Sequence, residues 1–376
     1  MNHELSSLVD VLKYFRAIHI MAMLLLGFGF LMVFVRGYGR STLTATYLLV
    51  SVTIPLYMLK DSLGIFGTVH SDIDRLILAE FAAASLLICA GAVLGRLKMY
   101  QYMILGLLFV FCYALNEWLL LEGVLKEGAF VDTGGSIMIH AFGAFFGLGV
   151  AFVMTTRKEY DTPIEADAIS DRFSLIGSMV LWVFWPSFCA ALVPVEAIPA
   201  TASNVILALC GATAATYIAS VALRKGKISA TDIANATIAG GVAIGSTCDR
   251  VSFGTAFVIG LLAGALSTFG FAVIQERFQR LIKKVDTCGV MYLHGLPGLL
   301  GGLAAVFVVD GIDRAAQIEG IVIAVAVALA TGLAVGGLLS LTGRRTEPYV
   351  DEEEFMVDVE GGTDGVVDLG SGAPVS

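Results

Sequence analysis

Two stretches of this chain share one pattern: Asp132 to Gly147, DTGGSIMIHAFGAFFG, and Asp286 to Gly302, DTCGVMYLHGLPGLLGG. Each places an aspartate eight residues ahead of a histidine, inside an apolar and glycine-rich run. His140 and His294 are two of only five histidines in the chain. An ionisable side chain inside an apolar segment is costly and by default suggests a functional site. The repetition suggests that each histidine is the partner of the other.

The composition is that of a membrane protein. Hydrophobic residues make up 57% of the 376 residues, charged residues only 15%, and 42 residues are glycine. Such a chain has too little polar surface to cover a soluble globule. We therefore predict a polytopic protein whose surroundings are a lipid bilayer. The net charge of -9 comes largely from an acidic tail, and no basic cluster suggests a nucleic-acid partner.

The cysteines do not form a recognisable site. Six are scattered along the chain without CxxC spacing, most of them inside apolar runs. This pattern predicts small packing residues, neither a disulfide framework nor a zinc site. Nothing in the sequence suggests an enzyme, a metal or a cofactor.

Apolar runs long enough to cross a bilayer as a helix, about 17–25 residues, define the predicted fold. We predict an all-α protein with eleven transmembrane helices, and the eighth, which is polar and rich in glycine, is expected inside the bundle. The predicted spans are 16–35, 42–60, 75–95, 99–121, 134–155, 173–193, 202–223, 231–248, 253–274, 290–309 and 317–342.

The distribution of Lys and Arg predicts the orientation, because cytoplasmic loops carry an excess of these residues. With eleven spans, sixteen of the 23 Lys and Arg residues fall on one side. The N-terminus is therefore predicted outside and the C-terminus in the cytoplasm of a cell with this protein in its plasma (inner) membrane. Residues 1–343 form the predicted membrane domain. Residues 344–376 form an acidic, partly disordered tail that could dock on basic loops or bind a cytoplasmic regulator.

The pattern of Asp and His recurs 154 residues later, at the start of the fifth and of the tenth span. The two copies are five spans apart. Because successive spans cross the membrane in alternate directions, the second copy runs through the membrane in the opposite direction to the first. This predicts an inverted repeat of spans 1–5 (about 12–157) and 6–10 (about 170–312), plus an eleventh helix at about 317–342. Such repeats place a substrate path near the bilayer midplane. Eight helical residues rise about 12 Å, so in a core of about 30 Å the two imidazoles are expected at nearly equal depth.

Two facing neutral imidazoles can hydrogen-bond each other and each keep one nitrogen for a guest. We predict that His140 and His294 line a narrow pore for a small polar species. A buried structural pair is the alternative, and a bis-histidine haem site is a third, although the glycines after each histidine favour an approach too close for a porphyrin. Asp132 and Asp286 are expected to cap helix N-termini, and Asp132 could also attract cations.

Aromatic residues form a second candidate site. Phe81 in the third span and Phe188 in the sixth, with Trp185, could form a gate, although aromatic residues in spans more often serve in packing. Glu80 beside Phe81 needs a polar partner or water inside the bilayer. It could also anchor the polar eighth span, which contains Asn235.

Three segments, GGSIMIHAFGAFFGL, DIANATIAGGVAIG and LHGLPGLLGGL, resemble in this order the signature segments of Rh-type ammonium channels. These channels are the Rh branch of the ammonium transporter/Rh glycoprotein superfamily, and GFGFLMVFVRGYG and RTEPYVDEEEF are similar to that branch too. The resemblance implies a homotrimer of eleven-helix subunits, each conducting ammonia or ammonium through its own pore. It implies that His140 and His294 are the twin pore histidines, Phe81 and Phe188 the external gate, and Asp132 the aspartate below the vestibule.

The chain departs from that family pattern in places. Cys189 follows Phe188 where Rh-type chains usually have Asn, and Met291-Tyr292 replaces a polar His-Asn step. Near Leu120 the tryptophan of ammonium transporters proper is missing, which implies a weaker external cation site. We hypothesise that ammonium loses a proton before passage and crosses as ammonia. Methylammonium and carbon dioxide stay open as substrates, and a carbon dioxide channel or an ammonium sensor are alternative functions of the same pore.

Overall fold

The computed structural model describes residues 3–162, 165–347 and 350–356. All regular elements in this part of the chain are helical, so the predicted all-α fold is confirmed. Ten of the helical segments are long and apolar enough to cross a bilayer, and they match ten of the predicted spans. They are Ser7–Phe34, Gly39–Ser62, Asp72–Ala92, Met99–Gly123, Ser136–Met154, Ala168–Cys189, Val195–Leu223, Phe253–Ile282, Met291–Val308 and Arg314–Ser340.

The predicted eighth span contains two short helices, α10 (Ala230–Ala236) and α11 (Ala239–Ile244). All of α11 is buried inside the bundle, where the sequence predicted this segment. Its glycines explain the close packing: a Cβ atom on Gly240 would lie 2.2 Å from a backbone oxygen, and one on Gly241 would lie 2.4 Å from the Trp185 ring. A segment this rich in glycine favours a broken helix because each glycine weakens the helical state.

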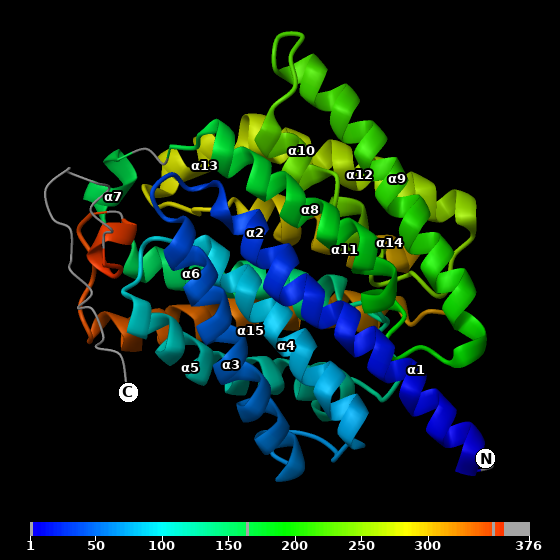
Figure 1. Ribbon diagram of the computed structural model, residues 1–376. Helices are drawn as coiled ribbons and strands as arrows, with labels where there is room; N and C mark the ends of the chain where they lie inside the picture. The colour runs from blue at the N-terminus through cyan, green and yellow to red at the C-terminus, as the bar shows by residue number, and fades with distance from the viewer. Residues whose placement is uncertain (1–2, 163–164, 348–349, 357–376) are drawn as a thin grey trace, which may run out of the picture.

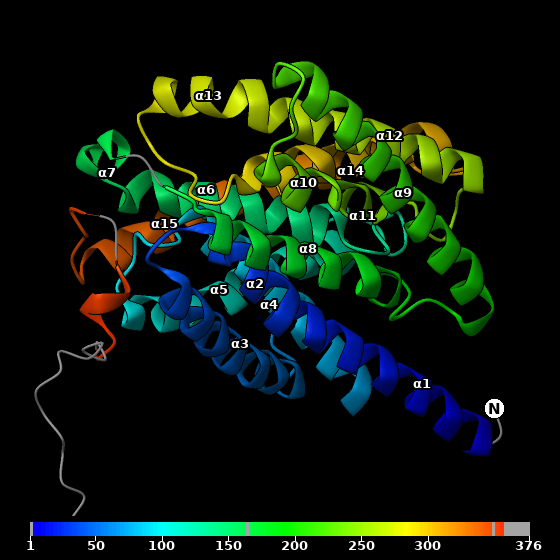
Figure 2. The same cartoon turned by 45° about the horizontal axis from the view of Figure 1, so that its top comes forward.

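The helices form a bundle in which most of the first half of the chain lies on one side and most of the second half on the other, except for α15 (Arg314–Ser340), which lies beside the first half (Figures 1 and 2). In Figure 1 the first half occupies the lower part with α3 (Gly39–Ser62), α4 (Asp72–Ala92) and α5 (Met99–Trp118). The upper part holds α9 (Ile198–Leu223) and α12 (Phe253–Phe269), which pack against each other. The two halves meet where α1 (His3–Ala22) contacts α8 (Ala168–Cys189).

Two central helices carry the repeated histidine motif. Helices α6 (Phe142–Met154) and α14 (Leu296–Val308) have 13 residues each. Each is preceded by a π-helical turn that holds the histidine, η4 (Ser136–Ala141) and η7 (Met291–Gly295), and these two turns contact each other. Short π-helical turns are common at functional sites. Both copies of the motif thus form a π-helical turn followed by a helix of 13 residues, which supports the predicted inverted repeat. The residue limits of the two repeats stay a prediction.

The last helix and the start of the tail close the fold. Helix α15 (Arg314–Ser340) packs along α6. The chain then crosses the end of the bundle where α7 (Arg157–Asp161) lies and enters the short turn η8 (Asp351–Glu353), as Figure 1 shows in red. We call this end of the bundle the tail side and the opposite end, where Asp132 lies, the gate side. The predicted disorder of the tail concerns mostly residues 357–376, which lie outside the described residues.

Candidate functional site

The structure brings His140 and His294 into direct contact. Their rings are parallel within 8°, with centroids 5.3 Å apart, and the two Nδ1 atoms lie 3.3 Å apart as a hydrogen bond. Both side chains are buried, with a relative exposure of 2% each. A hydrogen bond between two Nδ1 atoms requires one ring to donate and the other to accept. The direct contact leaves no room for a porphyrin between the rings, so this arrangement does not fit the haem alternative.

Each histidine is positioned by the aspartate at the start of its motif. The Asp132 carboxylate accepts hydrogen bonds from the backbone N–H groups of Ile137 at 3.0 Å and Met138 at 2.7 Å. Asp286 accepts from Val290 and Met291, both at 3.0 Å. These N–H groups lie at the start of each motif helix. The first N–H groups of a helix have no carbonyl acceptor within the helix, so the aspartate supplies the acceptor. The capping predicted for both aspartates is therefore present in the structure.

Aromatic rings continue the line of the histidines in both directions. On the gate side, Phe81 and Phe188 lie 4.7 Å apart between centroids, and Phe188 lies 6.0 Å from His140. Both phenylalanines are buried, so the contact closes this end of the line. On the tail side, the Phe28 ring stacks on His294 at 6.1 Å. Five rings thus follow one another, with the histidine pair between two apolar ends.

Trp185 adds a polar atom next to this line. Its ring stacks on His140 with centroids 5.5 Å apart. The indole Nε1 of Trp185 and the Nε2 of His140 are both buried, and neither has a hydrogen-bond partner among the described residues. Buried polar atoms without partners are rare in folded proteins and call for an explanation. A small guest with hydrogen-bonding capacity would supply one.

A chain of cavities leads from His294 to the tail side. A small cavity of about 20 Å³ is lined by His294, Phe28 and Asn235 among others, which is room for one molecule of the size of water. It shares Phe34, Asn235 and Cys288 with a second cavity of about 330 Å³. The tail-side end of the line of rings is therefore bordered by a small cavity, and next to it lies a wider vestibule.

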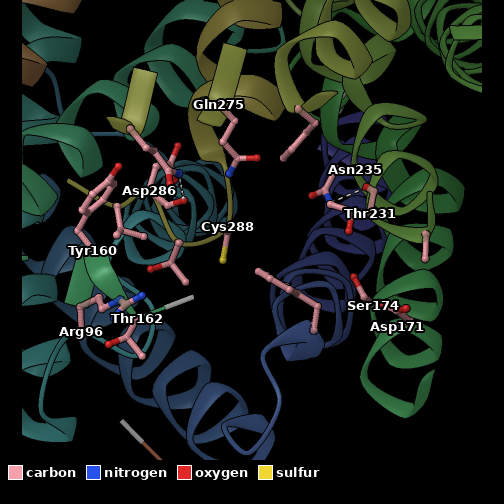
Figure 3. Close-up of a pocket in the computed structure, with 16 residues that line it drawn as sticks. Arg96, Tyr160, Thr162, Asp171, Ser174, Thr231, Asn235, Gln275, Asp286 and Cys288 are labelled. Atoms are coloured by element: carbon pink, nitrogen blue, oxygen red, sulfur yellow. Dashed lines mark hydrogen bonds between the residues drawn. The ribbon is translucent and has the colours of Figure 1, made fainter. Parts of the chain in front are cut away.

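The vestibule of 330 Å³ is polar and open to the tail side. Figure 3 shows Asn235 and Thr231 on one side of it and Asp286 on the other, with Gln275 between them. Arg96 also lines it and lies 3.9 Å from the buried Glu159. The pKa of Glu159 is raised above its ordinary value, mainly by burial. A backbone hydrogen bond from Thr156 and the charge of Arg96 lower it and offset only part of this effect.

Several residues of this site were not found by sequence reasoning. Ser246 donates to the Asp132 carboxylate, and Phe28 stacks on His294. Neither has a local signal, since serine and phenylalanine occur at many positions of this chain. The idea that Glu80 anchors the eighth span is not supported by the hydrogen bonds: the Asn235 side chain donates to its own helix at Thr231. Glu80 is buried next to Phe81, and its Oε2 atom has no partner in the described part of the chain.

Comparison with known proteins identifies a family. The sequence model of the Ammonium Transporter Family matches residues 4–357 of this chain. The chain is 36% identical to Ammonium transporter Rh type A of Bos taurus over 361 residues, covering 90% of this chain and 83% of that protein. It is 35% identical to Ammonium transporter Rh type C of Xenopus tropicalis over 327 residues, covering 81% and 68%.

Solved structures agree with this assignment. The structure of Nitrosomonas europaea Rh50, a channel of the Rhesus protein family, superposes with a TM-score of 0.91 at 54% identity and covers 96% of this chain and 95% of that one. A protein described as a sensor Amt protein shares the fold, with a TM-score of 0.80 at 18% identity over 92% and 96% of the two chains. Members of the family are transporters and not enzymes. The chain is therefore a polytopic membrane protein that belongs to the ammonium transporter family, in its Rh branch.

Proposed function

We propose that this chain is a channel that conducts ammonia past His140 and His294, after ammonium has lost a proton on the gate side. The single observation that carries the proposal is the hydrogen-bonded pair of buried imidazoles between two apolar ring contacts. The relatives support the substrate class, because their names describe them as ammonium transporters.

The histidine pair suits ammonia for a chemical reason. When one Nδ1 donates to the other, the donating ring keeps a bare Nε2 acceptor and the accepting ring keeps an Nε2–H donor. The pair therefore offers one acceptor and one donor to a guest. Ammonia is both a donor and an acceptor, so it can bind the two rings in turn as it passes.

The apolar surroundings favour the neutral species. A charge at the centre of a bilayer costs at least about 2.5–3.5 kcal/mol, whereas a neutral guest with hydrogen bonds to both rings avoids most of this cost. Phe81 and Phe188 on the gate side and Phe28 on the tail side offer a cation only their ring faces, an attraction of about 0.5–2 kcal/mol, and no charged group or hydrogen-bond acceptor in place of water. We propose that Asp132 supports the gate-side end of the path by holding the His140 turn in place.

The test is a measurement of ammonia flux in vesicles. Purified protein in proteoliposomes that contain a pH-sensitive dye is mixed with ammonium in a stopped-flow instrument, and internal alkalinisation reports the entry of ammonia. The wild-type protein should alkalinise the vesicles faster than empty liposomes do. The double variant His140→Ala/His294→Ala should lose most of this additional rate.

The chain offers a matched control. His19 is a membrane histidine that bonds Ser187 at 2.8 Å and is only partly buried, so His19→Ala should keep the wild-type rate. A double variant that conducts as fast as the wild type, with equal protein per vesicle, would contradict the assigned role of the pair. If the wild type itself does not exceed empty liposomes, the same vesicles can be tested with methylammonium and carbon dioxide, and a ligand-binding assay would then address a sensor.

We also propose the homotrimer that the family resemblance implies. From the distribution of Lys and Arg we propose an orientation with the gate side outside and the tail side in the cytoplasm, in the plasma membrane. The many exposed apolar side chains on the bundle surface, such as Phe307, 81% exposed, and Met179, 68% exposed, support contact with lipid or with further copies. Native mass spectrometry of the protein released from detergent should show three copies, and a mass of one copy would contradict this.

A further inference from the structure

A buried arginine without hydrogen-bond partners lies at the wall of the tail-side vestibule. Arg96 follows the end of α4 and lines the cavity of about 330 Å³. Its relative exposure is only 1%, and none of its three side-chain nitrogens, Nε, Nη1 and Nη2, has a hydrogen-bond partner among the described residues. A guanidinium carries five N–H donors in a rigid fork and stays charged in proteins. Burial of such a group without acceptors is costly, so the arrangement suggests an acceptor that enters from the cavity.

The carboxylate of Glu159 lies beside Arg96 but does not satisfy these donors. Its Oε1 atom is 3.9 Å from the Arg96 Nη1, which is too long for a hydrogen bond. Its Oε2 atom accepts from the N–H of Thr156 at 2.7 Å and from the hydroxyl of the same residue at 3.1 Å. Oε1 is buried and has no partner in the described part of the chain. The pair of side chains therefore keeps unused donors and an unused acceptor.

A third group with unused hydrogen-bonding capacity comes from the segment that crosses the end of α4. The N–H of Thr287 donates to the Ala92 carbonyl at 3.1 Å, which holds Thr287 near the turn that leads to Arg96. The Thr287 hydroxyl is buried and has no partner in the residues that the structure describes, and this residue lines the same cavity. Figure 3 shows the preceding residue, Asp286, on the same side of the cavity as Arg96.

The charges around this corner of the vestibule are compatible with an anion. Asp286 also lines the cavity, but its two carboxylate oxygens accept from backbone N–H groups at the start of its motif helix, where the helix dipole offsets its charge. Lys284 adds a positive charge near α7, because its ammonium group donates to the Thr155 carbonyl at 2.8 Å. Asp171 lies across the cavity from Arg96, as Figure 3 shows. The two positive charges on the arginine side therefore outweigh the carboxylate beside them.

We propose that this corner of the vestibule binds a small oxyanion that also carries an O–H group, held by Arg96, Thr287 and Glu159. The guanidinium and the Thr287 hydroxyl donate to oxygens of the ligand, and the ligand O–H donates to the free Oε1 of Glu159. An ionised carboxylate only accepts hydrogen bonds, so an oxyanion without an O–H meets repulsion there. The nitrogens of Arg96 lie just beneath the cavity wall, and rotation of this long side chain brings its fork to the ligand. The site does not depend on ammonia conduction.

The test compares two anions that differ in the O–H group. Inorganic phosphate carries an O–H at neutral pH, whereas sulfate has none. The full-length protein in detergent is titrated with each anion at constant ionic strength in an isothermal titration calorimeter. We expect one phosphate per chain, bound about tenfold or more tighter than sulfate, because the hydrogen bond to a charged acceptor is lost with sulfate. Absence of saturable phosphate binding, or equal affinities for the two anions, would overturn the proposal.

Variants assign the site to its residues, and a thermal midpoint shows that each variant is folded. Arg96→Gln should abolish phosphate binding. Arg96→Lys keeps the charge in place and should still weaken binding about tenfold, because an ammonium lacks the bidentate fork of the guanidinium. Thr287→Val should weaken the binding of both anions. Glu159→Gln should lose the preference for phosphate, because an amide N–H can donate to sulfate.

The matched control is Arg277→Gln, because Arg277 is an exposed arginine on α13 (Gln275–Ile282) that does not line the cavity. This variant should bind phosphate like the wild type. Wild-type phosphate affinity in both Arg96 variants would overturn the site. Wild-type behaviour of Thr287→Val or of Glu159→Gln would overturn the role of the residue concerned. Because the readout is binding, a failure of ammonia flux leaves these outcomes unchanged.

Discussion

The Asp132 side chain connects three parts of the chain. It accepts from two N–H groups of the His140 turn and from the Ser246 hydroxyl of a segment more than 100 residues away. Its relative exposure is 6%, so water cannot replace these donors easily. Hydrogen bonds to a charged acceptor contribute about 1.5–3 kcal/mol each, and a buried donor left without a partner carries a further cost. Asp132 is therefore a structural centre of the site, whatever it adds to the attraction of cations.

Replacement of this carboxylate should destabilise the protein. We expect Asp132→Ala to lower the free energy of unfolding by about 3 kcal/mol or more, because several buried donors lose their acceptor together. Thermal unfolding of the detergent-solubilised protein would show this as a lower midpoint. Asp10→Ala is the control, since Asp10 is exposed near the start of α1 and should leave the midpoint unchanged. Equal midpoints for Asp132→Ala and wild type would refute the anchoring role.

At the scale of elements, the close approach of the two motif helices depends on glycine, which has no side chain. A Cβ atom on Gly298 of α14 would lie 2.5 Å from the Ser136 carbonyl oxygen of η4 and 3.2 Å from the Ala141 side chain. The neighbours are mostly backbone atoms, which cannot rotate away. Small residues of this kind allow membrane helices to pack through their backbones. The histidine rings can meet because the helices that hold them are this close.

The variant Gly298→Ala should separate these helices. The added methyl group overlaps backbone of η4, so we expect both a lower thermal midpoint and a loss of ammonia flux, because the imidazoles are moved apart. Gly337→Ala provides the control: Gly337 is also helical, on α15, and nothing lies within 4 Å of its added Cβ. An alanine there should be neutral or slightly stabilising, since alanine favours the helix over glycine. If Gly298→Ala keeps the thermal midpoint and the flux of the wild type, the close contact at Gly298 is not needed to hold the two histidines together.

Sequence reasoning could predict those elements whose signals are local. The spacing from Asp132 to His140 and from Asp286 to His294 fixed the register of both motif helices, and the resulting equal depth anticipated the ring contact. The break between α10 and α11 was harder to predict, because a polar and glycine-rich run fits a buried helix and a broken one equally well. Ser246 could not be found at all, since its role arises from a contact with a distant segment.

At the scale of the whole molecule, the start of the tail fastens the tail-side ends of several helices. Asp351 accepts from the N–H groups of Arg40 at 3.0 Å and Ser41 at 2.8 Å, in the first turn of α3. Glu347 pairs with Lys158 of α7, and Gln101 of α5 donates to the Gly343 carbonyl at 2.8 Å. The sequence suggested that the tail docks on basic loops. In the structure one of these contacts is an ion pair with Lys158, whereas Asp351 caps the start of a helix.

The cap from Asp351 should be measurable because its carboxylate accepts from two backbone N–H groups at the start of α3, those of Arg40 and Ser41. Loss of a capping side chain costs about 0.5–2 kcal/mol, so Asp351→Ala should speed hydrogen exchange of the amides at the start of α3, measured by mass spectrometry. The control is Glu352→Ala, which removes the neighbouring exposed carboxylate and should leave exchange there unchanged. Because the anchor lies far from the histidine pair, ammonia flux should be kept in both variants. Unaltered exchange in Asp351→Ala would mean that α3 is held without the tail, and that the tail contacts do not stabilise this side of the fold.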